Sequence, residues 1–167
     1  KFIRSNLSLI SHGVREDGLL CICYPSGMDF PIPFFSLAYA IQLAEYVDRS
    51  GDVSILNETF DAVSRVMNTF ISRIDENGLI DAFPFPYWNF YEWSPGLSGA
   101  LFKPTGPCWD AALNCLLSMA LQTMHRLSEK LGQPDEYDEL DKRINRKIKS
   151  LFWDSSRGVF VNSTADS

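Results

Sequence analysis

The fold is decided by the stretch from Pro33 to Asp52, which reads PFFSLAYAIQLAEYVDRSGD. Pro33 suits the first turn of a helix, and apolar residues then cover nearly every side of the helix through position 49. A helix that is apolar all round is usually buried on all sides. Gly51 fits the C-terminal cap of this helix, and Asp52 fits the N-cap of the next. The stretch therefore predicts a buried inner helix at 33–49, followed at once by a second helix.

The second helix, expected at 53–74, is of a different kind. Its apolar residues recur every three or four positions and form a single stripe. The two kinds alternate again later, because 110–131 is apolar on most sides whereas 134–152 carries one stripe. The end of another helix is expected over 1–13. The pattern predicts an all-α fold of antiparallel helical hairpins, with buried inner helices and striped outer helices.

The links between the expected helices also alternate in length. Inner helices lead to outer ones through short turns, and outer helices lead to inner ones through long loops at 14–32 and 75–109, at one end of the fold. A similar turn follows each outer helix: Glu16-Asp17-Gly18-Leu19-Leu20, Glu76-Asn77-Gly78-Leu79-Ile80 and Ser156-Arg157-Gly158-Val159-Phe160. Two architectures fit such repeated hairpins: an open α-solenoid and a closed two-ring α/α toroid.

Composition and charge exclude several classes of protein. The chain has 167 residues, of which 46% are hydrophobic, which predicts one globular unit over 1–167 without an internal boundary. A net charge of −6 argues against a nucleic-acid partner, and no apolar run is long enough for a membrane span. The four Cys and two His fit no zinc spacing, and no cofactor motif is found, so neither a metal nor a cofactor is expected. The two ends of the sequence suggest a piece cut from a longer chain.

The second long loop contains the most informative segment, FPFPYWNFYEW at 83–93, in which seven of eleven residues are aromatic. Its polar members Asn89 and Glu92 lie between Trp88 and Trp93. Aromatic rings beside a carboxylate suit a carbohydrate, because the apolar face of a sugar stacks on a ring while a carboxylate accepts hydrogen bonds from hydroxyls. A small core of loop side chains packed on the helix ends explains the same composition, so both interpretations stay open.

The first long loop contributes Asp29 and Phe30. Asp29 lies four positions before a helix start, so its carboxylate could cap that helix or point into the same cleft as Glu92. Asp110, at the start of the helix 110–131, is interpreted as an N-cap.

At this level of detail the sequence resembles the six-hairpin glycosidases, and within them the bacterial α-L-rhamnosidases of glycoside hydrolase family 78. The resemblance covers nearly the whole chain. Its more specific part is the loop Tyr87-Trp88-Asn89-Phe90-Tyr91-Glu92-Trp93, whereas Gly-Asp turns and Asn-Gly-Leu repeats are generic to α/α toroids. The other segments that carry it are Gly18-Leu19-Leu20, Asp29-Phe30, Ser50-Gly51-Asp52, Asp75-Glu76-Asn77-Gly78-Leu79, Asn114-Cys115-Leu116-Leu117, Leu151-Phe152-Trp153-Asp154 and Gly158-Val159-Phe160.

The resemblance implies about five of the twelve helices of an (α/α)6 toroid, the middle of a domain that cleaves terminal α-L-rhamnosides with inversion. It implies a rhamnose site formed by six residues: Asp29, Phe30, Trp88, Asn89, Glu92 and Trp93. It also implies that the general acid precedes Lys1 and the general base follows Ser167, so no catalytic residue is expected within the chain. The chain alone would then be inactive.

Other functions remain compatible with the sequence. One is a different α/α-toroid glycosidase of the trehalase or debranching type, and another is a non-catalytic helical-repeat binding module. A carbohydrate is the expected partner, and self-association through the edges of an incomplete barrel is expected as well. The resemblance to bacterial enzymes implies a cytoplasmic or periplasmic location, with the cytoplasm slightly favoured.

Overall fold

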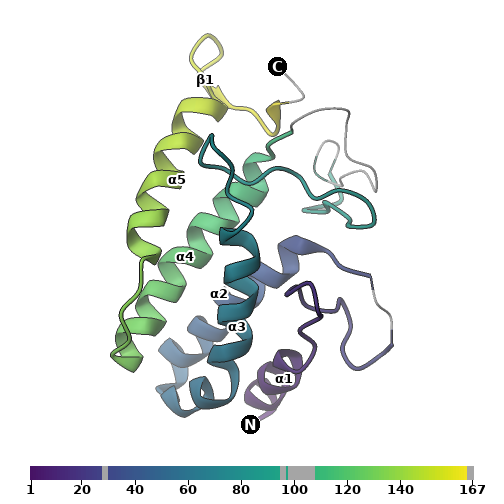
Figure 1. Ribbon diagram of the computed structural model, residues 1–167, viewed down its shortest axis with the longest axis vertical. Coiled ribbons are helices and arrows are strands. Elements are labelled where there is room, and N and C mark those ends of the chain that lie inside the picture. Colours follow the sequence, from purple (N-terminus) through teal and green to yellow (C-terminus); the bar gives the residue numbers. More distant parts are fainter. Residues whose placement is uncertain (28–29, 95–96, 98–107, 165–167) are drawn as a thin grey trace.

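The structure is a computed structural model that describes residues 1–27, 30–94, 97 and 108–164. Helices dominate the part that is described, and the antiparallel helical hairpins expected from the sequence are confirmed (Figure 1). The elements are, in order, α1 (Phe2–Ser11), α2 (Pro33–Ser50), η1 (Val53–Ile55), α3 (Leu56–Ile71), α4 (Ala111–Leu131), α5 (Tyr137–Phe152), β1 (Trp153–Asp154) and β2 (Val159–Phe160). The closure of these hairpins into a complete ring stays a prediction.

Helix α4 is the centre of the core, as its apolar composition predicts. It packs most extensively against α5 and α2, while α3 contacts α1 and α2. Leu117 and Leu121 of α4 are completely buried. On α5 the burial is one-sided and includes Ile144 and Ile148, in agreement with the single apolar stripe. The outer role of α5 is therefore confirmed. Helix α4 is central, but the expectation that it is apolar and buried on most sides is wrong within the described residues, because Met119 is 51% exposed and Cys115, Gln122 and Arg126 are exposed as well.

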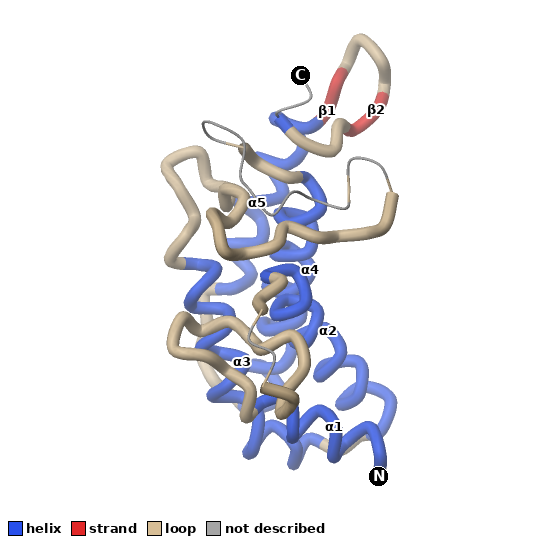
Figure 2. The backbone as a smooth tube through the Cα atoms, turned by 90° about the vertical axis from the view of Figure 1, so that its right-hand side faces the viewer, coloured by secondary structure: helices blue, strands red, loops and turns tan. Residues whose placement is uncertain are grey.

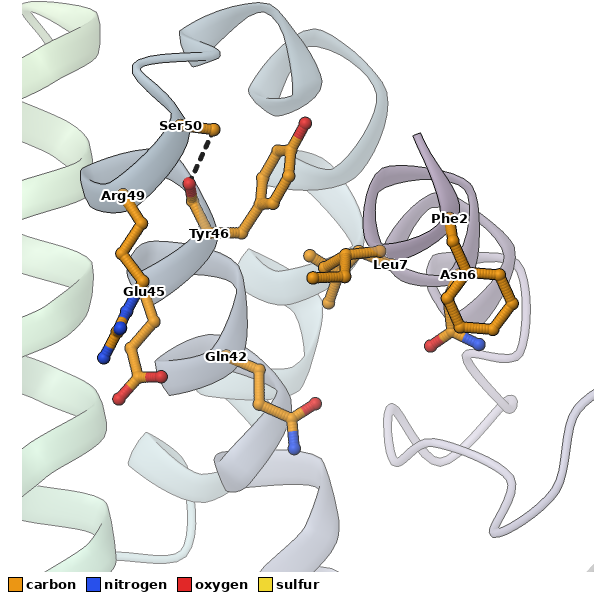
Figure 3. Close-up of a pocket in the computed structure, with 9 residues that line it drawn as sticks. Phe2, Asn6, Leu7, Gln42, Glu45, Tyr46, Arg49 and Ser50 are labelled. Atoms are coloured by element: carbon orange, nitrogen blue, oxygen red, sulfur yellow. Dashed lines mark hydrogen bonds between the residues drawn. The ribbon is translucent and has the colours of Figure 1, made fainter.

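Helix α2 is buried on one side only. Leu37 and Leu43 are completely buried, but Gln42 and Glu45 are exposed. Their side of α2 faces a hollow of about 470 Å³ that α2 shares with α1, where Leu7 lies across from them (Figure 3). The expectation of burial on all sides is wrong for this helix within the described residues, because no described helix fills that hollow.

The helix ends follow their local signals, with small differences. Gly51 adopts the left-handed conformation with φ 71° and ends α2 as expected. Asp52 occupies the N-cap position of η1 without capping it, because its carboxylate accepts hydrogen bonds from Tyr46 and Arg4 instead. Helix α5 begins at Tyr137 rather than at 134, and the Asp135 carboxylate accepts a hydrogen bond from the Tyr137 N–H at 2.9 Å.

The repeated turn of the sequence is a repeated turn in the structure. It follows α1, α3 and α5, and its glycine has a positive φ each time: 81° at Gly18, 79° at Gly78 and 67° at Gly158. An aspartate closes each turn by accepting backbone hydrogen bonds, as Asp17 does from the Leu19 N–H at 3.0 Å. Because an L side chain rarely adopts a positive φ, glycine at this position is required by the turn.

Candidate functional site

Two long loops lie at the start of the inner helices, away from the turn that joins α2 to α3 (Figure 2). The first precedes α2 and the second precedes α4. Hydrogen bonds between their described residues join them: the Trp88 N–H donates to the Pro31 carbonyl at 3.3 Å, and the Tyr87 hydroxyl donates to the Asp17 carboxylate at 3.0 Å. The structure therefore brings the two predicted parts of the site together.

Rings from both loops and from α2 form what we call the aromatic cluster, which consists of Phe30, Phe35, Trp88, Phe90 and Trp93. Phe30 lies 6.1 Å from Trp88 between ring centroids, and Trp88 lies 5.9 Å from Trp93. Phe90 is 4.8 Å from Trp88, 4.7 Å from Trp93 and 6.3 Å from Phe35. Phe90 is 8% exposed and forms the buried base of the cluster, whereas Trp93 is 76% exposed. Three of the predicted site residues, Phe30, Trp88 and Trp93, thus share one surface.

Asn89 has a different place from the one expected. It is buried, its Oδ1 accepts a hydrogen bond from the Phe83 N–H at 2.9 Å, and its Nδ2 donates to the Phe83 carbonyl at 2.8 Å. This pair of bonds closes the segment between the two residues into a loop. The carboxamide is therefore engaged with backbone, and its contact with a sugar stays a prediction.

Glu92 is exposed beside Trp93. Its Oε1 accepts a hydrogen bond from the Trp93 N–H at 2.6 Å, which fixes the carboxylate next to the exposed indole. Its own N–H donates to the Leu97 carbonyl at 3.0 Å. The carboxylate is in a position to accept further hydrogen bonds from solvent or from a ligand. Asp29, the remaining predicted site residue, lies outside the described residues.

Asp110 is at the N-cap position of α4, as expected, but its side chain makes no capping hydrogen bond. Its carboxylate accepts a hydrogen bond of 2.7 Å from the Tyr91 hydroxyl. Burial raises the pKa of Tyr91 far above its ordinary value, and the adjacent Asp110 carboxylate raises it further, so the hydroxyl stays protonated and donates. The N-cap position of Asp110 is therefore as expected, but its carboxylate bonds to the nearby tyrosine and does not cap the helix.

Sequence reasoning missed two residues that hold the loops. In the sequence, Tyr91 is only one of the seven aromatic residues of the segment 83–93. Asn114 was hidden within an apolar helix, yet it is completely buried and hydrogen-bonded to both the N–H and the carbonyl of Ile80. A polar residue inside an otherwise apolar helix face was the available signal for it.

The described residues contain no group of three or more His, Cys, Asp and Glu side chains arranged to hold a metal ion. Among the described helices, none combines the length and apolar character that a membrane crossing needs. The hollow between α1 and α2 is lined by apolar and aromatic residues of α1 together with polar and charged residues of both helices (Figure 3), and it shares no lining residue with the aromatic cluster.

Comparison with known families agrees with this picture. The family model described as the bacterial alpha-L-rhamnosidase six-hairpin glycosidase domain matches residues 1–167. The chain belongs to this family. No curated protein matches the chain.

Among solved structures, the GH78 family rhamnosidase of Bacillus sp. GL1 resembles the chain with a TM-score of 0.80, and the match covers 96% of the 167 residues of this chain. The identity is 21%, so this likeness concerns the fold alone. The chain spans 16% of the length of that protein. A glycoside hydrolase domain of the six-hairpin class therefore accounts both for the alternation of helices and for the long loops.

Proposed function

We propose that this chain is part of the catalytic domain of an α-L-rhamnosidase and that its aromatic cluster binds the terminal rhamnose. The observation that carries the proposal is the convergence of Phe30, Trp88 and Trp93, which come from two loops far apart in the sequence. Family membership supplies the chemical class of the substrate.

The cluster offers the two kinds of contact that a sugar needs. The exposed Trp93 indole presents an apolar surface on which the C–H face of a pyranose can stack. The Glu92 carboxylate lies next to that indole and can accept hydrogen bonds from ring hydroxyls. Binding and orientation are the roles that we assign to these residues.

Hydrolysis with inversion needs a general acid, a general base and space for a water molecule between them. We infer that the acid and base come from other parts of the domain, as the resemblance to the family implies, and that the 167-residue chain by itself does not hydrolyse glycosides. The whole unit 1–167 would then be one continuous segment of that domain.

The test is hydrolysis of p-nitrophenyl α-L-rhamnoside and of the corresponding α-glucoside, by the chain alone and by the complete gene product. Activity of the complete product on the rhamnoside only, with an inactive chain, is the expected result. Preference for the glucoside would indicate a trehalase or debranching type of enzyme instead. Absence of activity on both, together with absence of sugar binding, would indicate a helical-repeat binding module.

A further inference from the structure

The segment that carries the two indoles is attached to the scaffold at alternate residues. Trp88 and Phe90 belong to the aromatic cluster, whereas Asn89 and Tyr91, which alternate with them, bond to other parts of the fold. Alternation of this kind is the rule in extended backbone, where successive side chains point to opposite sides. One set of side chains thus belongs to the aromatic cluster, while the other set holds the backbone in place.

The two attachments reach different partners. Asn89 bonds to the backbone of Phe83 through both atoms of its carboxamide, at 2.9 and 2.8 Å. Tyr91 donates its hydroxyl to Asp110 at 2.7 Å, and its ring lies 5.4 Å from that of Phe34 at the start of α2. The second attachment therefore ties the loop to the first residues of both inner helices, α2 and α4.

A charged acceptor makes the Tyr91 attachment strong and directional. Hydrogen bonds to a carboxylate are shorter and stronger than bonds between neutral groups, and burial strengthens them further. The Asp110 backbone is fixed as well, because its carbonyl accepts from the Asn114 N–H at 3.2 Å and from the Asn114 side chain at 3.0 Å. The acceptor is thus held at the first turn of a helix that forms the centre of the core.

We propose that Asn89, Tyr91 and Asp110 are positioning residues that set the spacing of Trp88 and Trp93 for sugar binding. This inference rests on the proposed function, and it assigns Asn89 an indirect role in place of the sugar contact expected from the sequence. The three residues act through the two indoles, whose centroids they hold 5.9 Å apart. A sugar site needs its stacking surfaces held in place before the ligand arrives, because ordering them on binding costs affinity.

The test compares Tyr91→Phe with Tyr46→Phe in the full chain. Tyr46 donates to the Asp52 carboxylate at 3.0 Å near the C-terminal end of α2, so both variants lose one tyrosine–aspartate hydrogen bond. Binding of L-rhamnose is followed by tryptophan fluorescence, and the geometry of the Trp88–Trp93 pair by the exciton signal of coupled indoles in circular dichroism. We expect Tyr91→Phe to weaken rhamnose binding about fivefold and to reduce the exciton signal, while Tyr46→Phe changes neither.

A second pair of variants separates positioning from general stability. Asp110→Asn keeps an oxygen that accepts from the Tyr91 hydroxyl and should retain the exciton signal, whereas Asp110→Ala should lose it. Equal behaviour of the two, or an unchanged signal in Tyr91→Phe, would overturn the inference. If the unmodified chain binds no rhamnose, the proposed function fails, but the exciton signal still decides whether these residues position the indoles.

Discussion

The carboxamide of Asn114 pairs with the backbone of Ile80 on both sides: its Oδ1 accepts from the Ile80 N–H at 2.9 Å, and its Nδ2 donates to the Ile80 carbonyl at 3.0 Å. Ile80 belongs to the turn after α3, so the bond joins that turn to the inner helix α4. The first turn is joined to α2 in a similar way, because Ser36 Oγ accepts from the Leu20 N–H at 3.0 Å. Each inner helix therefore holds the turn that precedes its loop.

Substitution of Asn114 by Ala should destabilise the fold strongly. It leaves the N–H and carbonyl of Ile80 without their partner in a fully buried place, which we expect to lower the free energy of unfolding by about 3 kcal/mol. Urea denaturation measures this. Asn68→Ala is the matched control, since Asn68 is exposed on α3, and it should change stability by less than about 0.5 kcal/mol. Equal stability of the two variants would contradict the role of Asn114.

Gly18→Ala should lower the free energy of unfolding more than Gly158→Ala does. Both glycines have a positive φ, but a Cβ at Gly18 would lie 1.9 Å from Thr69 Oγ1, whereas a Cβ at Gly158 meets nothing within 4 Å. We expect a loss of about 1 kcal/mol at Gly158, from backbone strain alone, and about 3 kcal/mol at Gly18. Thermal unfolding of the two variants gives the comparison, and losses of similar size would show that Thr69 moves aside.

Stability should fall at acid pH partly because of Asp17. Burial opposes its ionisation, but hydrogen bonds from Arg15, the Leu19 N–H and Tyr87 outweigh burial and hold its pKa below the ordinary 3.8. A carboxylate with a lowered folded pKa stabilises fully above its unfolded pKa and loses this contribution as the pH falls through the folded value. The free energy of unfolding of Asp17→Asn should therefore differ from that of wild type at neutral pH, and the difference should shrink as the pH falls through the lowered folded pKa of Asp17.

The control for this prediction is Glu16→Gln, which removes an exposed carboxylate from the same turn. The free energy of unfolding of Glu16→Gln should differ little from that of wild type at every pH, because an exposed carboxylate contributes little to stability. Urea unfolding across the pH range measures both variants. A difference for Asp17→Asn that stays constant down to the lowest pH would show that this carboxylate is not the titrating group.

Trp93→Ala should weaken sugar binding without affecting stability. Trp93 is 76% exposed, so its removal uncovers little of the core, but it takes away the surface proposed for stacking. We expect rhamnose to bind about tenfold more weakly, as measured by calorimetric titration. Trp153→Ala removes another exposed indole, packed 5.0 Å from Phe160 on the β1–β2 hairpin, and should leave binding unchanged.

The hollow between α1 and α2 should cause self-association of the chain. Its wall includes Phe2 and Ile3, which are 84% and 61% exposed, and apolar surface of this kind is buried when a partner is present. We expect the apparent mass in size-exclusion chromatography to rise with concentration and Ile3→Glu to suppress the rise. Val53 is another exposed apolar residue, in η1, and Val53→Glu should leave the rise in apparent mass unchanged. A monomer at all concentrations would exclude this surface as a contact between copies.

The helices and turns could be predicted from the sequence because their signals are local. The spacing of apolar residues distinguishes α4, which is apolar on most sides, from α5, which carries one apolar stripe. The glycines at 18, 78 and 158 mark the repeated turn. The aromatic segment was recognisable for the same reason, since its composition is unusual within a few residues. Apolar periodicity overestimated the burial of α2 and α4, because an apolar residue such as Met119 can lie at an edge as well as in a core.

By itself the sequence determined the all-α class, the alternation of inner and outer helices, and the loop on which to look for a sugar site. Only the tertiary structure decided which residues of that loop hold the scaffold and which can meet a ligand. The residue types of Asn89 and Tyr91 do not distinguish them from the polar and aromatic residues beside them. Their hydrogen bonds to Phe83 and Asp110 form because the folded chain brings those residues next to them. A hydrogen bond between residues 19 positions apart, such as that of Tyr91 with Asp110, has no local pattern to reveal it.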